Sequence, residues 1–224
     1  MYDIDIARIV IEVVSAIACF VLLKFMVKPY KLTGENRYLF LPLGFGFLGV
    51  SYAVSALAYS QLITFSEIAW QQLFTRAFAF AFLAVTYYFS KQTAKSSKSL
   101  WNMTLILLIG IVITLFSLSF IAPQFTFEGY QLVSAYVRVL NIICLLYIVV
   151  HTLRSHIEKP DPTTIIIPFG YIFLGIGQYS ILIWAIDSST LSFFGGLAAR
   201  LAGLSVFLFV SYKSFYGSWK SGNK

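Results

Sequence analysis

Seven long runs of apolar residues, separated by short polar segments, divide the chain. The runs cover about residues 6–27, 39–59, 68–89, 101–122, 131–153, 164–186 and 191–215. A helix needs about 20 apolar residues to cross the hydrocarbon core of a bilayer, and each run has about that length. Pro29 is expected to break the helix of the first run, and Pro160 and Pro162 separate the fifth run from the sixth. We therefore predict an all-α polytopic membrane helical bundle of seven transmembrane helices, with residues 1–224 forming a single domain.

The composition also points to a membrane protein. Hydrophobic residues make up 59% of the chain and charged residues 11%, whereas soluble domains average about 45–50% and about 25%. A water-soluble fold of this size has too little interior to bury so much apolar surface, so we expect the lipid bilayer to solvate it. The net charge of +7 comes from basic residues at the ends of the apolar runs. This charge indicates membrane topology, and no nucleic-acid partner is predicted.

Basic residues are distributed unequally between the loops. The first, third and fifth loops and the C-terminal tail contain lysine or arginine, whereas the second, fourth and sixth loops contain none. Because cytoplasmic loops are enriched in these residues, we predict a cell-membrane protein with its N-terminus outside and its C-terminus inside. The basic cytoplasmic face is expected to attract anionic lipids. The basic residues are Lys24, Lys28, Lys31, Arg37, Lys91, Lys95, Lys98, Arg154, Lys159, Lys213, Lys220 and Lys224.

Two parts of the chain resemble each other. Residues 42–49 open the second span, residues 168–175 open the sixth, and five of their eight positions are identical. Arg76 follows the first of these prolines by 34 residues, and Arg200 follows the second by 32. We therefore predict a 3+1+3 parallel pseudo-repeat, in which the two triplets are related by an axis along the membrane normal. Its parts are repeat 1 at about 6–90, a connecting helix at about 101–122 and repeat 2 at about 130–216.

The predicted topology resembles that of SWEET-type sugar transporters and of microbial rhodopsins. The sequence signatures of both families are missing. Pro123-Gln124 lies in an external loop, away from the position of the PQ-loop motif. Lys213 lies at the cytoplasmic end of the seventh span, whereas rhodopsins bind retinal midway along that helix. The resemblance is therefore one of topology, and no retinal or other cofactor is predicted.

Four ionisable residues stand out well inside the predicted spans, where a charge at the bilayer centre costs on the order of 2.5–3.5 kcal/mol. Glu12, Arg76, Arg138 and Arg200 all lie in the outer half of the bilayer. Three arginines against one glutamate leave two positive charges, and guanidinium groups pair well with carboxylate or phosphate. The candidate ligand-binding residues, which also include polar residues at the same level, are Arg76, Arg200, Arg138, Glu12, Gln178, Asn141 and Tyr52. In the alternative interpretation the arginines reach lipid headgroups or form a fixed structural network.

These features predict a small-solute transporter or solute-binding protein with an outward-facing cationic site for anionic or polar ligands. Two alternatives remain open: a sensory module that acts through a separate cytoplasmic partner, and a non-catalytic subunit of a larger membrane complex. No enzyme is predicted, because the chain has neither G-x-S-x-G nor H-E-x-x-H. No metal site is predicted either, and the position of His151 and His156 near a cytoplasmic helix end argues against a haem held by paired histidines inside the bundle.

Overall fold

The computed structural model describes residues 2–33, 39–60, 65–90, 94–121, 127–158, 160 and 165–214. Within these ranges the chain forms seven helices and no strand, which confirms the predicted all-α fold for this part of the chain. The helices are α1 (Tyr2–Thr33), α2 (Phe40–Tyr59), α3 (Phe65–Ser90), α4 (Ala94–Ile121), α5 (Phe127–Glu158), α6 (Ile166–Asp187) and α7 (Thr190–Tyr212).

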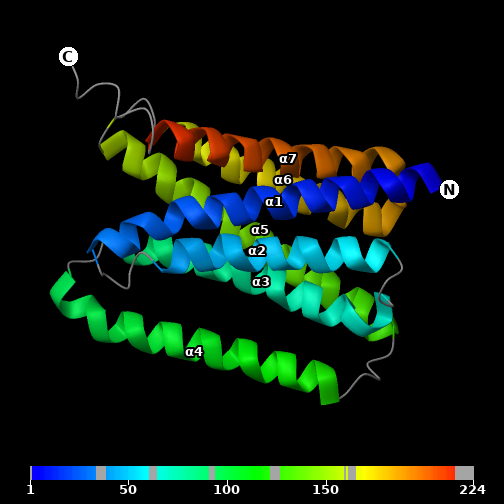
Figure 1. Cartoon of the computed structure of the whole chain (residues 1–224), viewed down its shortest axis with the longest axis horizontal. Helices are drawn as coiled ribbons and strands as arrows, with labels where there is room; N and C mark the ends of the chain where they lie inside the picture. The colour runs from blue at the N-terminus through cyan, green and yellow to red at the C-terminus, as the bar shows by residue number, and fades with distance from the viewer. Residues whose placement is uncertain are drawn as a thin grey trace.

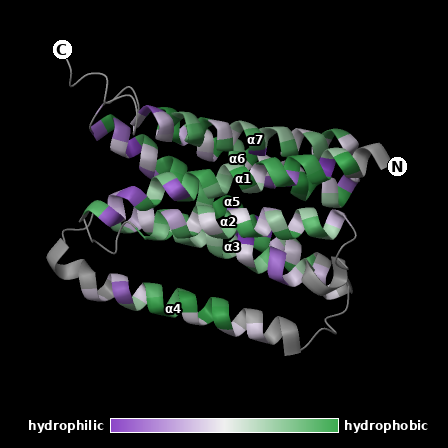
Figure 2. Ribbon diagram, in the orientation of Figure 1, coloured by the Kyte–Doolittle hydropathy of each residue, from purple (hydrophilic) through white to green (hydrophobic). Residues whose placement is uncertain are grey.

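Five helices in the described ranges, α1, α2, α5, α6 and α7, are long and apolar enough to cross a membrane. α3 contains Gln71, Gln72 and Arg76, which lower its hydropathy, and the described apolar part of α4 covers only Trp101–Thr114. Apolar residues dominate along the helices (Figure 2). Large apolar side chains point outward from the bundle, while several polar and charged side chains are buried inside it. This inverted distribution, together with the five spans, indicates a multi-pass membrane protein.

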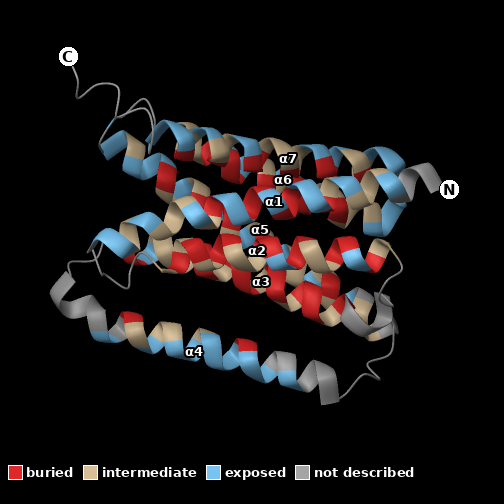
Figure 3. Cartoon of the chain, in the orientation of Figure 1, coloured by how far each residue is buried: buried red, intermediate tan, exposed pale blue. Residues whose placement is uncertain are grey.

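Six of the helices form a closed ring. Going around it, α1 packs on α2, α2 on α3, α3 on α5, α5 on α6, α6 on α7, and α7 on α1. α4 lies outside this ring and packs against α3 (Figure 1). The largest buried cluster occupies the inside of the ring and includes Phe45, Leu48, Tyr52, Leu145 and Leu204. Most described positions of α4 are exposed or half-buried (Figure 3). The six-helix ring, and not α4, therefore contains the interior of the molecule.

Glycine allows α6 and α7 to approach each other closely. A Cβ atom added to Gly203 of α7 would lie 2.8 Å from the backbone oxygen of Gly170 in α6. One added to Gly177 would lie 3.0 Å from the backbone oxygen of Gly196. Small residues at such positions let the backbones of membrane helices pack directly against each other.

The first helix is longer than the sequence predicted. We expected Pro29 to break it, but Pro29 lies inside α1, which continues to Thr33. Proline removes one backbone N–H and so leaves one carbonyl in the preceding turn without its helical partner. The neighbouring residues Lys28 and Lys31 are exposed, so water can reach the backbone at this end of α1. The helix therefore tolerates proline in its last two turns.

Candidate functional site

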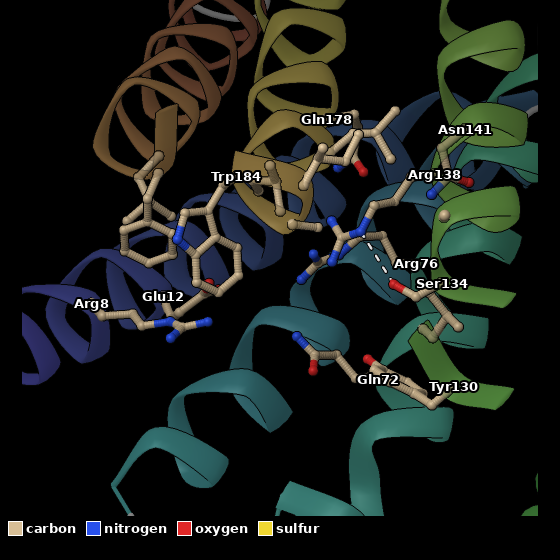
Figure 4. Close-up of a pocket in the computed structure, with 18 of the residues that line it drawn as sticks. Arg8, Glu12, Gln72, Arg76, Tyr130, Ser134, Arg138, Asn141, Gln178 and Trp184 are labelled. Carbon is tan, nitrogen blue, oxygen red and sulfur yellow. Dashed lines mark hydrogen bonds between the residues drawn. The ribbon is translucent and has the colours of Figure 1, made fainter. Parts of the chain in front are cut away.

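A cavity of about 610 Å³ opens between the helices of the ring, at the end of the bundle where α1, α3, α5 and α7 begin. All six ring helices contribute side chains to its wall, and α4 contributes none among the described residues. The polar and charged residues of the wall include Arg8, Glu12, Tyr59, Gln72, Arg76, Tyr130, Ser134, Arg138, Asn141 and Gln178 (Figure 4). Ligand sites in proteins have volumes of about 300–1,000 Å³, so the cavity has the size of a small-molecule site.

Glu12 of α1 forms a salt bridge with Arg200 of α7. The distance between Glu12 Oε1 and Arg200 Nη1 is 3.0 Å, and both side chains are almost completely buried. The other carboxylate oxygen, Oε2, has no hydrogen-bond partner in the described part of the protein. Glu12 belongs to the cavity wall, whereas Arg200 lies behind it. The pair therefore places a neutralised carboxylate on one side of the cavity.

The ring of Tyr52 lies between two arginines. Its centroid is 4.4 Å from Arg200 Cζ and 5.1 Å from Arg76 Cζ, and the side chain is fully buried in α2. A guanidinium group within about 6 Å of an aromatic ring gains cation–π energy. Tyr52 therefore supports both arginines from behind the cavity wall. Arg76 Nη2 also donates a hydrogen bond to Ser55 Oγ at 3.5 Å. The same oxygen accepts a hydrogen bond from Gln72.

Arg76 and Arg138 form a second charged group, on the side of the cavity where α3 meets α5. Their guanidinium groups lie beside each other (Figure 4). Arg138 donates a hydrogen bond from Nε to Ser134 Oγ at 3.3 Å, while its Nη1 atom is buried without a partner. Neither arginine forms an ion pair with a carboxylate in the described ranges. This side of the cavity therefore has two positive charges that no acidic side chain balances among those the structure describes.

Two buried amides complete the polar wall. Asn141 lies one turn after Arg138 in α5 and is 1% exposed, yet neither its Oδ1 nor its Nδ2 atom has a hydrogen-bond partner among the described residues. The Oε1 atom of Gln178 in α6, itself 3% exposed, is also unpartnered there. Buried polar atoms are paired in most proteins. Both residues belong to the cavity wall, while these amide atoms themselves are buried in it.

Arg8 contributes a further charge to the cavity, and our sequence analysis did not identify it. Its Cζ atom lies 3.4 Å from the ring centroid of Tyr59 and 4.7 Å from that of Phe193, and it donates a hydrogen bond to the Tyr59 hydroxyl. The sequence contains a signal for this residue, because Arg8 precedes Glu12 by four positions and so shares its helix face. Arg8 is thus enclosed by aromatic rings from α2 and α7.

Five of the seven candidate residues, Arg76, Arg138, Glu12, Asn141 and Gln178, line the cavity. The other two, Arg200 and Tyr52, hold Glu12 and Arg76 from behind. Arg76 and Arg200 are 7% and 3% exposed, so they face the interior of the bundle and do not reach a lipid-facing surface. Lining residues that the sequence analysis missed are Arg8, Tyr59, Tyr130, Ser134, Trp184 and Phe193.

Tyr130 lies just before the apolar part of α5, near the open end of the cavity. Burial raises the pKa of its phenol, so Tyr130 is a neutral hydrogen-bonding group at physiological pH.

No three histidine, cysteine or acidic side chains in the described ranges lie close enough to hold a metal ion. Comparisons with protein-family models, with curated proteins and with solved structures found no match to this chain.

Proposed function

We propose that this protein binds or transports a small anionic or polar solute through a cavity open to the outside of the cell. The observation that carries the proposal is the pair of arginines, Arg76 and Arg138, that face one cavity without a balancing carboxylate in the described residues. A buried positive charge is costly unless it is paired. An anion that enters the cavity supplies the missing partner, and arginine is the side chain best suited to hold it.

The positions of the exposed basic residues support the proposed orientation. Lys24, Lys28, Lys31, Arg154 and Lys213 are all exposed, and all lie near the ends of α1, α5 and α7, away from the cavity. Basic residues mark the cytoplasmic ends of membrane helices. The cavity then faces outward, and α3 and α4 complete a set of seven spans in the cell membrane.

The order of helices in the ring supports the proposed repeat. A twofold axis through its centre would exchange α1 with α5, α2 with α6 and α3 with α7, and the observed order of contacts fits that exchange. Close contacts recur at matching positions. A Cβ atom on Gly44 would lie 3.1 Å from the backbone oxygen of Ala79, and one on Gly203 would lie 2.8 Å from that of Gly170. Parallel repeats that enclose a central site occur in transporters, where one half moves against the other.

Thermal stability in the presence of anions tests this function. A solute that binds the folded state stabilises it by RT ln(1 + [L]/Kd), or about 2.7 kcal/mol at a concentration of 100 Kd. We expect one or more small anions to raise the melting temperature of the purified protein in detergent, and neutral analogues of the same shape to leave it unchanged. Arg76→Gln removes this stabilisation, while Arg154→Gln, on the exposed surface of α5, retains it. The proposal is wrong if no anion stabilises the wild-type protein.

Transport and sensing make different predictions for reconstituted protein. In proteoliposomes, a transporter exchanges a radiolabelled anion across the bilayer, and Arg76→Gln abolishes the exchange. A sensory module or a subunit of a larger complex binds the anion without exchanging it. The cavity is lined by both halves of the proposed repeat, and this arrangement favours transport over a purely structural role.

A further inference from the structure

The two proposed repeats place different charges at equivalent positions. Glu12 and Arg138 are 126 residues apart, which is also the separation of Pro42 and Pro168 at the start of the repeated motif. Arg76 and Arg200 are 124 residues apart. The contact between α1 and α7 therefore corresponds to the contact between α5 and α3. The first contact contains the Glu12–Arg200 salt bridge, and the second contains Arg138 and Arg76. One of these two equivalent contacts between the repeats has an acid and a base, where the other has two bases.

The second difference concerns the polar residue one turn further along. Ser15 in α1 donates a hydrogen bond at 2.7 Å to the backbone oxygen of Ile11 in its own helix. Asn141 occupies the equivalent place in α5, again 126 residues later, and its amide atoms have no partner in the described part of the chain. Asn141 is buried and lines the cavity. The α3–α5 contact thus presents two arginines to the cavity, whereas the equivalent α1–α7 contact presents one carboxylate, that of Glu12.

The rest of the wall is mostly apolar, with the Arg8 guanidinium lying over the Phe193 ring within it. Ile181, Leu182 and Trp184 of α6, together with Phe193 and Leu197 of α7, face the same space. An inorganic anion gains nothing from such a wall, whereas an organic anion buries its apolar part there. Glu12 adds a carboxylate to this region, which disfavours a second acidic group on the ligand.

We infer that the cavity binds a small monocarboxylate whose carboxylate group takes, between Arg76 and Arg138, the role that Glu12 plays beside Arg200 at the equivalent contact between the repeats. The apolar or aromatic body of the ligand lies against the side chains of Trp184 and Phe193, beside Arg8. This inference rests on the proposed function and adds the class of ligand and the residues that select it.

The substitution Arg138→Glu tests the inference, because it rebuilds in α5 the carboxylate that Glu12 provides in α1. The variant is compared with the wild-type protein in lipid nanodiscs by calorimetric titration with benzoate, with laurate as a carboxylate derived from lipid, with inorganic phosphate, and with benzamide as a neutral control. We expect wild-type protein to bind a carboxylate and not benzamide. In Arg138→Glu the carboxylate affinity falls by about tenfold to a hundredfold, as for the loss of one or more charged hydrogen bonds, and the melting temperature without ligand rises.

Arg154→Glu is the matched control, because it makes the same charge change in the same helix on an exposed residue. It should keep the wild-type carboxylate affinity. Arg138→Gln provides a second test if Arg138→Glu does not fold, and it should also weaken carboxylate binding by at least about tenfold. Binding of benzoate identifies a water-soluble ligand, and binding of laurate alone identifies a ligand from the bilayer; both outcomes support a carboxylate site.

Three results contradict the inference. The first is an Arg138→Glu or Arg138→Gln variant that binds the carboxylate as tightly as wild type. The second is an Arg138→Glu protein that folds but melts at a lower temperature than wild type, since a rebuilt ion pair with Arg76 must stabilise. The third is a wild-type protein that binds phosphate and neither carboxylate, which overturns the inference while the proposed anion site stands. If no anion binds at all, both fail.

Discussion

Glu12 and Arg200 are 188 positions apart in the sequence and form a buried salt bridge of 3.0 Å between the first helix and the last. This contact joins α1 to α7 and closes the ring of six helices. It also uses the only acidic side chain among the described residues that line the cavity. Arg76 and Arg138 consequently face the cavity without an acidic partner among the described side chains.

Replacing Glu12 with glutamine should destabilise the protein strongly. The substitution preserves the shape of the side chain but leaves the buried Arg200 charge without its partner. Breaking one side of a buried ion pair costs about 3–5 kcal/mol. We expect this loss in the free energy of unfolding, measured by circular dichroism in detergent. Replacing both residues with leucine should recover much of the stability, because well-packed apolar residues can substitute for a buried pair.

Glu158→Gln is the control for this prediction. Glu158 accepts a hydrogen bond at 3.2 Å from Arg154, four residues earlier in α5, and both side chains are substantially exposed. Exposed pairs of this kind contribute about 0.3–0.5 kcal/mol. A loss as large as that of Glu12→Gln would mean that the effect comes from general changes in charge and not from burial of the pair.

The Tyr52 ring should matter more than the Tyr52 hydroxyl. Tyr52→Phe keeps the ring that contacts Arg76 and Arg200 and removes a hydroxyl without a partner among the described residues, so its stability should stay within about 0.5 kcal/mol of wild type. Tyr52→Leu removes the ring and loses about 2 kcal/mol or more of desolvated cation–π energy. Chemical denaturation of both variants measures the difference. Equal effects of the two substitutions would exclude a role for the ring.

The sequence was sufficient to predict the helical fold because long apolar runs have few alternatives in a bilayer. It also identified half of the polar residues named in the cavity wall, since a charge well inside an apolar run is conspicuous wherever it points. It did not reveal that Arg200 would lie behind Glu12, because every helix here is apolar nearly all round and its rotation is set by packing. The aromatic wall was missed for the same reason, as Trp184 and Phe193 resemble any other interfacial aromatic residue in the sequence.

The close approach of α6 and α7 predicts opposite effects for two glycine substitutions. In Gly203→Ala the new methyl group meets the backbone oxygen of Gly170 at 2.8 Å, and backbone cannot move aside cheaply, so stability should fall by about 1–3 kcal/mol. In Gly175→Ala the methyl group meets no atom within 4 Å, and stability should rise by about 0.4–1 kcal/mol. Melting temperatures of the two variants test this directly. A stabilised Gly203→Ala protein would show that the two helices are farther apart.

Trp101 should hold α4 to the ring without affecting the cavity. Its ring packs edge-on against Phe40 at 4.0 Å and Phe89 at 4.7 Å, and it is 3% exposed. Trp101→Ala removes this contact, at a cost of about 3–5 kcal/mol for a buried aromatic residue. We expect faster hydrogen–deuterium exchange in α4 and an unchanged anion affinity, because no described residue of α4 lines the cavity. Met103→Ala, on an exposed position of the same helix, should change neither quantity. A drop in anion affinity in Trp101→Ala would instead show that α4 shapes the site through α3, against which it packs.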